Sequence, residues 1–358
     1  MIVHIVGNRP QFIKLAPLYH ELQRRNYEQC IIHSGQHYDA NLSDIFFEEL
    51  KIPQPYANLQ VGSGSHAQIT AGAMLGLEKE LINLSPNLVI LYGDTDTTLA
   101  GALAASKLNI LTAHVEGGTR THHKENPEEC NRIVADHLSD ILFCSDQISL
   151  EDAGKEGMGE KAFWTGDIMY DTFLSAAHES EGSNEQEEMI LMTWHRQENT
   201  ASKERMESII RLIKRLDGKI VCPMHPRTQK CLKNYGLWEE ITRIENMEII
   251  EPVGYLEMIG LMQRAKLIVT DSGGVSKESS FAGAKCLFML DLDIWDDLVK
   301  AGWIVKVDPE NEESIKDALV FAGKAVRVEE KDRPKYYGDG HAAKKIVDLL
   351  EQHCLLNK

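Results

Sequence analysis

The chain has 358 residues, 43% of them hydrophobic and 26% charged, a composition that excludes a disordered or collagen-like protein. This length exceeds what one hydrophobic core usually supports, so two domains are expected. The 55 acidic residues outnumber the 38 basic ones, and the net charge of −17 disfavours nucleic acid as a partner, although a few local cations and backbone N–H groups can still bind a small anion.

Short runs rich in β-branched residues alternate along the chain with stretches of helical spacing. The expected strands are IVHIV (2–6), CIIHS (30–34), NLVILY (87–92), NILTAHV (109–115), DILFCS (140–145), MILMTW (189–194), KIVCPM (219–224), LIVTD (267–271) and CLFML (286–290). Helical spacing occurs at 17–25, 67–82, 98–107 and 203–216. Strands that alternate with helices form parallel sheets, which predicts an α/β fold of two doubly wound, Rossmann-like domains.

The domain boundary is predicted near HESEGSNEQEE (178–188), the most polar stretch in the middle of the chain, because a fresh series of strands follows it. We expect an N-terminal domain, 1–170, and a C-terminal domain, 171–341, that face each other across a cleft. The last helix, within 342–358, can pack on either domain, and we place it on the first.

The cellular location is inferred from cysteines and the N-terminus. The seven cysteines are scattered, odd in number and without a C-x-x-C pair, which predicts buried thiols in a reducing compartment. The first residues lack a basic leader and a cleavage site, and no apolar run approaches the roughly 18 residues of a membrane span. We therefore expect a cytoplasmic protein without membrane contact.

Polar segments follow six of the expected strands, where ligands of open α/β sheets bind. These segments are GNRPQFIK (7–14), GDTDTT (93–98), EGGTR (116–120), TWHRQEN (193–199), PMHPR (223–227) and TDSGG (270–274). Each alone is also what an ordinary turn contains. Six such segments at the carboxyl ends of the expected strands favour a binding site over ordinary turns.

The segment TDSGGVSKE (270–278) has the composition of an anion site. Glycines directly before a helix let backbone N–H groups approach a phosphate, and the helix dipole adds positive potential. A diphosphate suits this position, with Ser272 as a hydroxyl donor and Glu278 placed for ribose hydroxyls. The alternative is a helix N-cap, Asp271 or Ser272, with glycines needed for packing. Arg9 and Lys14 form a second anion signature, against the alternative of a solvated basic helix end.

Acids after strands are candidates for general acid and base catalysis. They are Asp94 and Asp96, Glu116, and Glu128 and Glu129. Metal binding by Asp94 and Asp96 is the alternative, but the sequence lacks the further ligands of a calcium or magnesium site. His195 and His225 each follow a strand and precede basic residues, so they are candidates for proton carriage or phosphate binding, against a structural role.

Taken together, ten motifs resemble, in order, the blocks of the non-hydrolysing UDP-N-acetylglucosamine 2-epimerases. They are GNRPQFIKLAPL, SGQHYD, YGDTDTTLAGALAA, AHVEGGTRT, PEECNRIVADHLSD, GDIMYD, HRQEN, PMHPR, TDSGG followed by KE, and YGDG, and the resemblance runs from residue 3 to about 350. RPQFIK and GDIMYD look closer to the branch that acts on UDP-2,3-diacetamido-glucuronic acid.

The resemblance implies a glycosyltransferase-B type fold, with UDP held mainly by the C-terminal domain. It implies that Asp94, Glu116, Glu128 and His195 match the catalytic positions. The positions it implies for substrate and UDP binding are Arg9, Lys14, Gln36, Arg120, Arg132, Arg196, His225, Ser272, Gly273, Gly274 and Glu278. It also implies a homodimer that acts in cell-surface polysaccharide synthesis. Nothing is oxidised in the implied reaction, so no nicotinamide or other cofactor is expected, and no metal is expected either.

The implied reaction is inversion at sugar C2 of a UDP-linked N-acetylated amino sugar, by elimination and re-addition of UDP. Two alternatives stay open: a related enzyme that hydrolyses or transfers the sugar, and a nucleotide-sugar-binding protein without catalysis. The chain departs from the family at Leu290, Asp293 and Ile294, where members usually have Arg and then Thr-Glu. It also has GSGSHAQ (62–68) where the bacterial allosteric site uses an Arg-Gln pair.

Overall fold

The computed structural model describes residues 1–35, 47–123, 125–179, 189–291 and 295–356. They form two compact units, which we call unit 1 (Met1–Leu174 with Lys335–Lys358) and unit 2 (Ser175–Pro334). The boundaries inferred from the sequence, 170/171 and 341/342, lie near these divisions but stay a prediction about independent domains. Most of the polar stretch expected to mark the boundary, 180–188, lies outside the described residues.

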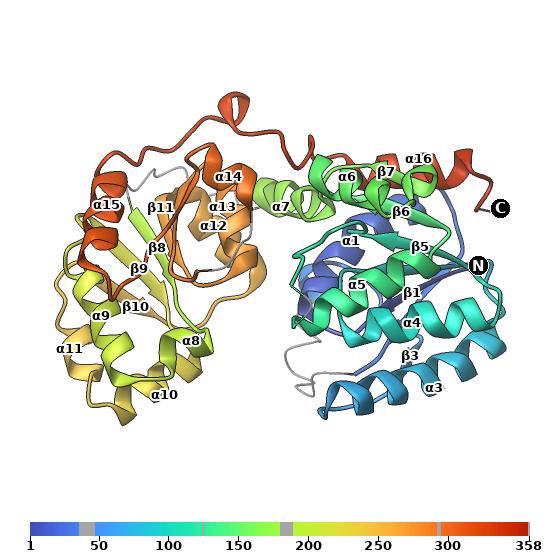
Figure 1. Ribbon diagram of the computed structural model, residues 1–358, viewed down its shortest axis with the longest axis horizontal. Coiled ribbons are helices and arrows are strands. Elements are labelled where there is room, and N and C mark those ends of the chain that lie inside the picture. The colour runs from blue at the N-terminus through green and yellow to red at the C-terminus, as the bar shows by residue number, and fades with distance from the viewer. Residues whose placement is uncertain (36–46, 124, 180–188, 292–294, 357–358) are drawn as a thin grey trace. The chain divides into compact units, whose positions relative to one another are not determined.

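Unit 1 is a parallel sheet with helices on both faces (Figure 1). In the described residues the sheet order is β3-β2-β1-β4-β5-β6-β7. Its strands are β1 (Ile2–Val6), β2 (Gln29–His33), β3 (Ala57–Asn58), β4 (Leu88–Tyr92), β5 (Leu111–Val115), β6 (Ile141–Cys144) and β7 (Ala162–Trp164). Its helices are α1 (Arg9–Arg24), α3 (His66–Leu84), α4 (Asp96–Lys107), α5 (Pro127–Leu138), α6 (Gln147–Lys155), α7 (Ile168–Glu179), which ends in unit 2, and α16 (Ala342–Gln352).

Unit 2 repeats this plan with the order β10-β9-β8-β11-β12-β13 among its described strands. The strands are β8 (Met189–Thr193), β9 (Lys219–Pro223), β10 (Met247–Ile250), β11 (Ala265–Thr270), β12 (Lys285–Phe288) and β13 (Ile304–Lys306). The helices are α8 (Gln197–Thr200), α9 (Lys203–Ile213), α10 (Pro226–Asn234), α11 (Trp238–Thr242), α12 (Tyr255–Arg264), α13 (Gly273–Ala282), α14 (Asp296–Lys300) and α15 (Glu312–Gly323). Figure 1 shows α9 and α15 on one face of the sheet and α12 and α13 on the other.

The predicted α/β fold with two doubly wound parallel sheets is confirmed. The apolar runs indicate the inner strands and miss β3, β7, β10 and β13, which are the edge strands of the two sheets. Edge strands are short and covered less completely, so they lack a continuous apolar run. Helix α1 begins at Arg9, earlier than the spacing from residue 17 indicates, because Pro10 in a first helical turn needs no N–H partner.

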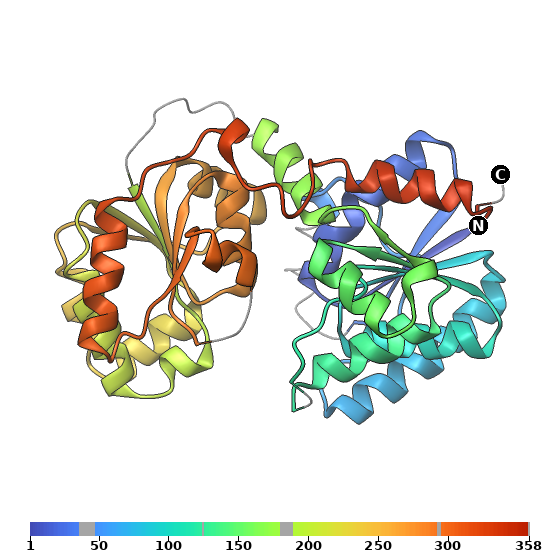
Figure 2. The same cartoon turned by 45° about the horizontal axis from the view of Figure 1, so that its top comes forward.

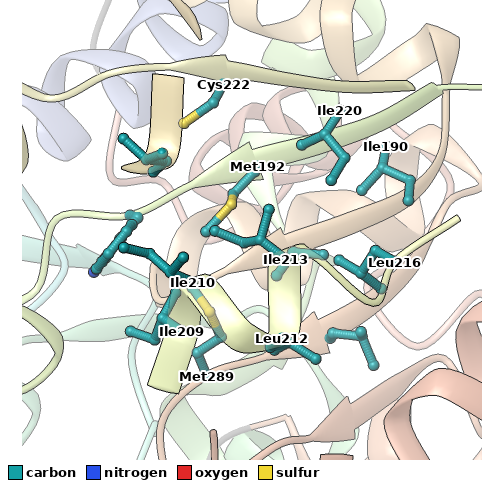
Figure 3. Close-up of a cluster of buried hydrophobic side chains, with 14 of the residues drawn as sticks. Ile190, Met192, Ile209, Ile210, Leu212, Ile213, Leu216, Ile220, Cys222 and Met289 are labelled. Atoms are coloured by element: carbon teal, nitrogen blue, oxygen red, sulfur yellow. The ribbon is translucent and has the colours of Figure 1, made fainter. Parts of the chain in front are cut away.

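The core of unit 2 shows how burial fixes a helix to its sheet. In α9, Met206, Ile209, Ile210 and Ile213 recur at helical spacing, and all are fully buried. Figure 3 shows the α9 side chains lying against those of β8 and β9. Truncating one of these isoleucines to alanine is expected to cost about 2–5 kcal/mol of folding free energy.

The C-terminal helix α16 packs on α1 of unit 1, and Figure 2 shows it in red among the blue and green elements. Its inner face carries Ile346, Val347 and Leu350, all buried. The Asp171 carboxylate accepts the N–H groups of Ala342 and Ala343 at 2.9 Å each, which satisfies donors at the start of α16. The C-terminal segment, Lys335–Lys358, thus forms one unit with the N-terminal segment, Met1–Leu174.

No helix within the described ranges has both the length and the apolar character that crossing a bilayer requires.

Candidate functional site

Both sheets reverse their strand order at one point, between β1 and β4 in unit 1 and between β8 and β11 in unit 2. Ligands of doubly wound sheets bind at the carboxyl ends of the strands beside such a point. The predicted site residues of each unit follow those strands or their neighbours.

In unit 1, Asp94 follows β4 through a tight turn at Gly93, which has a positive φ of 61°. Its carboxylate forms an ion pair with Arg132 of α5, and its side chain is 34% exposed. Asp96, two residues on, is buried and accepts hydrogen bonds from Asn131 and His66 instead. Asp94 and Asp96 therefore have separate partners, and the described part of the chain contains no group of three or more His, Cys, Asp or Glu placed to hold a metal ion.

Glu116 follows β5 and forms an ion pair with Lys14 of α1. Its φ of 69° places a non-glycine residue in the left-handed region, a strain found most often at functional sites. A Cβ atom on Gly93 would lie 3.0 Å from Lys14 Nζ and 3.5 Å from Glu116 Oε2. Glycine at position 93 therefore leaves room for this ion pair next to the turn that carries Asp94.

The first turn of α5 presents two glutamates with different surroundings. Glu128 is exposed, whereas Glu129 is buried and accepts hydrogen bonds from Thr121, His122 and Arg132. Burial raises the pKa of the Glu129 carboxyl, but these donors outweigh burial and hold the pKa below its ordinary value. Only Glu128 of the two has a solvent-facing carboxylate.

Two arginines predicted to contact substrate are bonded within unit 1. The Arg120 side chain is 1% exposed and donates to Asp136 at 2.7 Å and to both oxygens of Glu156 at 2.8 Å each. This geometry does not support a direct substrate contact by Arg120. Arg132 is 13% exposed and bridges Asp94 to Glu129, with 3.0 Å to the latter.

In unit 2, His195 follows β8 and is held by Asp271, which follows β11. The buried Asp271 carboxylate lies 3.1 Å from His195 Nδ1 and accepts the backbone N–H groups of His195 and Arg196. Burial raises the pKa of the Asp271 carboxyl, but the hydrogen bond and charge of His195 and the backbone donors keep it below its ordinary value. An ionised Asp271 fixes the proton on Nδ1, which leaves Nε2 of His195 to exchange a proton.

His225 lies beside His195, with ring centroids 5.5 Å apart. Its Nδ1 accepts the backbone N–H of Arg227 at 3.1 Å and caps α10. Partial burial, and then the positive charges of His195 and Arg227, lower the pKa of His225. A neutral His225 with Nδ1 occupied can donate from Nε2 to an anionic ligand. Arg196, between the two histidines in sequence, has an exposed side chain.

Helix α13 begins at the anion motif predicted from the sequence. Ser272 caps it by accepting the N–H of Val275 at 3.4 Å, and Gly273 and Gly274 form its first residues. Among the described residues, a Cβ on Gly274 would meet only Ser272 Oγ, at 4.0 Å, so this part of the turn leaves room for a close approach. The buried Glu278 carboxylate accepts the Tyr255 hydroxyl at 2.9 Å.

Some predicted positions fall outside this description. Gln36 and the departures at Asp293 and Ile294 lie outside the described residues, and the side chain of Arg9 is not described. Leu290 is buried in unit 2. A hollow of about 750 Å³ in unit 2 lies where β9 and β10 begin, and its lining includes Lys214 and Glu248. It is at the edge of the sheet opposite His195. The candidate site is therefore identified by its functional groups and not by the volume of a cavity.

Sequence reasoning missed Asp271 as a partner of His195 and His114 as a buried donor. Asp271 directly precedes the N-cap Ser272, so the sequence suggested a cap, whereas the structure uses its carboxylate for His195. A signal existed in α5, where Glu129, Arg132 and Asp136 recur at helical spacing, although polar residues there suggest a solvent face.

Comparisons with known proteins agree on one family. The family model described as UDP-N-acetylglucosamine 2-epimerase matches residues 20–351. A UDP-N-acetylglucosamine 2-epimerase homolog of Methanococcus maripaludis is 43% identical over 98% of this chain and 99% of that protein. The UDP-2,3-diacetamido-2,3-dideoxy-D-glucuronate 2-epimerase of Pseudomonas aeruginosa is 39% identical, again over 98% and 99%.

Among solved structures, the Methanocaldococcus jannaschii UDP-GlcNAc 2-epimerase in complex with UDP-GlcNAc and UDP is 36% identical. It matches with a TM-score of 0.83 over 98% of this chain and 99% of that one. The resemblance inferred from the sequence motifs is thereby confirmed: the chain belongs to the UDP-N-acetylglucosamine 2-epimerase family.

Proposed function

We propose that the protein is an isomerase that inverts C2 of a UDP-linked N-acetylated amino sugar by eliminating and re-adding UDP. The observation that carries the proposal is the pair of carboxylates, Asp94 and Glu116, that follow neighbouring strands of unit 1 in a chain of this family. The sugar is UDP-N-acetylglucosamine or its 2,3-diacetamido uronic acid analogue, the substrates named for the similar proteins.

The chemistry requires departure of UDP before C2 can invert. The hydrogen on C2 is not acidic because C2 bears no carbonyl group. Breaking the bond between C1 and the diphosphate gives C1 positive character, which allows a carboxylate to remove the C2 proton and leaves a C1–C2 double bond. UDP oxygen then adds back to C1, and a proton is delivered to the other face of C2.

The acids of unit 1 suit the proton transfers in this scheme. The Asp94 and Glu116 carboxylates are ion-paired with Arg132 and Lys14, and a carboxylate is a group that can accept a proton in such a step. Glu128 adds an exposed carboxylate on α5. One acid removes the proton from C2 and another returns a proton to C2. Because interacting carboxylates share their protons, these two roles belong to the group of acids as a whole.

The strand ends of unit 2 suit the departing diphosphate. The N-terminus of α13 offers backbone N–H groups and positive potential to the developing charge, beside the Ser272 hydroxyl. Glu278 is assigned to the ribose, and His195, His225 and Arg196 to the phosphates or to proton carriage. Arg9 and Gln36 keep their predicted place among the UDP contacts.

The wider setting follows from family resemblance. We assign the protein to the cytoplasm, as a homodimer that supplies an epimerised UDP-sugar for polysaccharide synthesis. Its oligomeric state can be measured by light scattering, independently of activity.

The experiment that tests the reaction is incubation with each candidate UDP-sugar in deuterated water, followed at C2 by NMR. Deuterium at C2 with UDP still attached supports epimerisation. Release of free sugar instead would identify a hydrolase. Unchanged sugar that nevertheless raises the melting temperature would identify a binding protein, and either of these outcomes overturns the proposal.

A further inference from the structure

His114 is a fully buried histidine in the central strand β5, two residues before Glu116. Its Nε2 lies 2.7 Å from the carbonyl oxygen of Gly93, and its Nδ1 lies 2.7 Å from Oδ1 of Asp136. The ring therefore links the turn that carries Asp94 to helix α5.

The hydrogen-bond partners determine where the protons of this ring reside. A carbonyl oxygen can only accept, so Nε2 carries a hydrogen that it donates to Gly93. An ionised carboxylate also only accepts, so Nδ1 carries a hydrogen as well. Both ring nitrogens of His114 therefore face acceptor oxygens beneath the strand ends.

Asp136 is ionised because it is surrounded by donors. Its Oδ2 accepts the backbone N–H of Gly118 at 3.0 Å and Arg120 Nη1 at 2.7 Å, while Oδ1 receives His114. Burial raises the pKa of the Asp136 carboxyl, but His114 and Arg120 outweigh burial and hold it below its ordinary value. Arg120 is itself fixed by Glu156 at the end of α6.

Three segments that carry proposed reacting groups meet at this network. The Gly93 turn is tied to β5 twice, through His114 and through its own N–H, which donates to Val115 O at 3.0 Å. The loop that follows Glu116 is tied to Asp136 through Gly118. Helix α5, which begins beside Glu128, supplies Asp136.

We propose that His114, Asp136 and Arg120 form a buried, charged positioning network that holds the loops of Asp94 and Glu116 in their reactive places. The expected effect of this network on turnover rests on the proposed function. The expected charge of His114 does not. The network contacts loops rather than substrate, so its members are positioning residues. Arg120 thereby acts through Asp136.

A second buried histidine in unit 1 provides a matched control. His4 of β1 is also fully buried and makes two side-chain hydrogen bonds, to Tyr92 at 2.6 Å and Gln29 at 2.8 Å. Its partners are side chains rather than a strand-end turn. His4→Gln therefore removes a buried imidazole from the same unit without breaking a hydrogen bond to the turn that carries Asp94.

The first measurement is NMR of the ¹⁵N-histidine-labelled full chain at neutral pH, with the His114 signals assigned by their loss in His114→Gln. We expect both ring nitrogens of His114 to be protonated, and expect Asp136→Asn to remove that signature. A singly protonated His114 in the unaltered protein overturns the proposal. This readout needs no turnover, so it stays informative if the proposed reaction fails.

The second measurement is C2 deuterium exchange by His114→Gln, Asp136→Asn and His4→Gln, each with its melting temperature. In His114→Gln the amide can still donate to Gly93 but carries no charge, so we expect kcat to fall about 100-fold, as for a small misplacement of reacting groups. UDP affinity should change less than threefold. Equal activity in His114→Gln and His4→Gln at equal stability overturns the positioning role.

Discussion

The two units share a strand order but place opposite chemistry at their strand ends. In unit 1 carboxylates face cations, Asp94 with Arg132 and Glu116 with Lys14. In unit 2 the acid, Asp271, is buried behind His195, and what the strand ends present is imidazole, hydroxyl and backbone N–H groups. The doubly wound sheet therefore determines where a site lies, while the few residues after each strand determine what it can do.

This difference predicts a division of labour that mutations can separate. Changes to the acids of unit 1 should lower the rate of the chemical step, because these acids act on protons. Changes to the donors at the start of α13 in unit 2 should weaken UDP binding, because these donors face an anion.

Asp94→Asn should have the largest effect. The amide keeps the size of the side chain but loses the proton-accepting carboxylate, so kcat for C2 exchange should fall by about 10²–10⁴-fold. UDP affinity, measured by calorimetry, should stay within a few-fold of the unaltered protein.

The control for this change is Asp140→Asn, at the opposite end of the sheet, where Asp140 accepts the backbone N–H of Thr112 at 2.8 Å. It should leave both kcat and UDP affinity unchanged. Loss of UDP binding in Asp94→Asn would show that Asp94 supports the structure, and the proposed division between the units would be wrong.

The difference between the units also explains what the sequence can predict. The inner strands are indicated by apolar runs because both faces of a parallel sheet are covered. Polar residues directly follow each apolar run. Once the strands are placed, the carboxyl edge of the sheets is therefore predicted to carry Asp94, Glu116, His195 and Ser272. These local patterns can be recognised without knowing which residues form hydrogen bonds or ion pairs with one another.

Partner choice, by contrast, depends on residues far apart in the chain. The sequence indicates Arg120 as a substrate contact, but Asp136 and Glu156 bind it, sixteen and thirty-six positions away. Without the family resemblance, the residue pattern does not separate Glu128 from Glu129, whereas the structure shows Thr121 and His122 donating hydrogen bonds to the latter. Edge strands are missed for a related reason, since their pairing is supplied by neighbours rather than by their own apolarity.

Ser272→Ala tests unit 2 with a smaller expected effect. Removing one hydroxyl donor to the diphosphate should raise the Kd for UDP about tenfold or more, the value of a hydrogen bond to a charged group. The comparison variant is Ser202→Ala, because Ser202 caps α9 in the same unit by accepting the N–H of Arg205 at 3.1 Å. Both variants lose a helix cap. A similar Kd for UDP in the two variants would therefore show that Ser272 does not contact UDP.

The smallest effect concerns stability rather than activity and arises from His4. Burial lowers the pKa of His4 to about 4, against 6.5 for an exposed histidine. The folded chain therefore keeps His4 neutral while the unfolded chain takes up a proton, so stability falls as pH drops from about 6.5 to about 4, by up to about 3 kcal/mol.

Comparing the unaltered protein with His4→Gln isolates this contribution, because Asp171 in the same unit acts with the opposite sign. Burial raises the pKa of the Asp171 carboxyl to about 6, so its folded form holds a proton that the unfolded form releases, and its contribution grows as pH falls. Urea unfolding of both proteins at pH 7 and pH 5, followed by hydrogen exchange of unit 1 peptides, should show a smaller loss of stability on acidification in His4→Gln. Equal losses would mean that the pKa of His4 is the same in the folded and the unfolded chain, against the lowering that its burial implies.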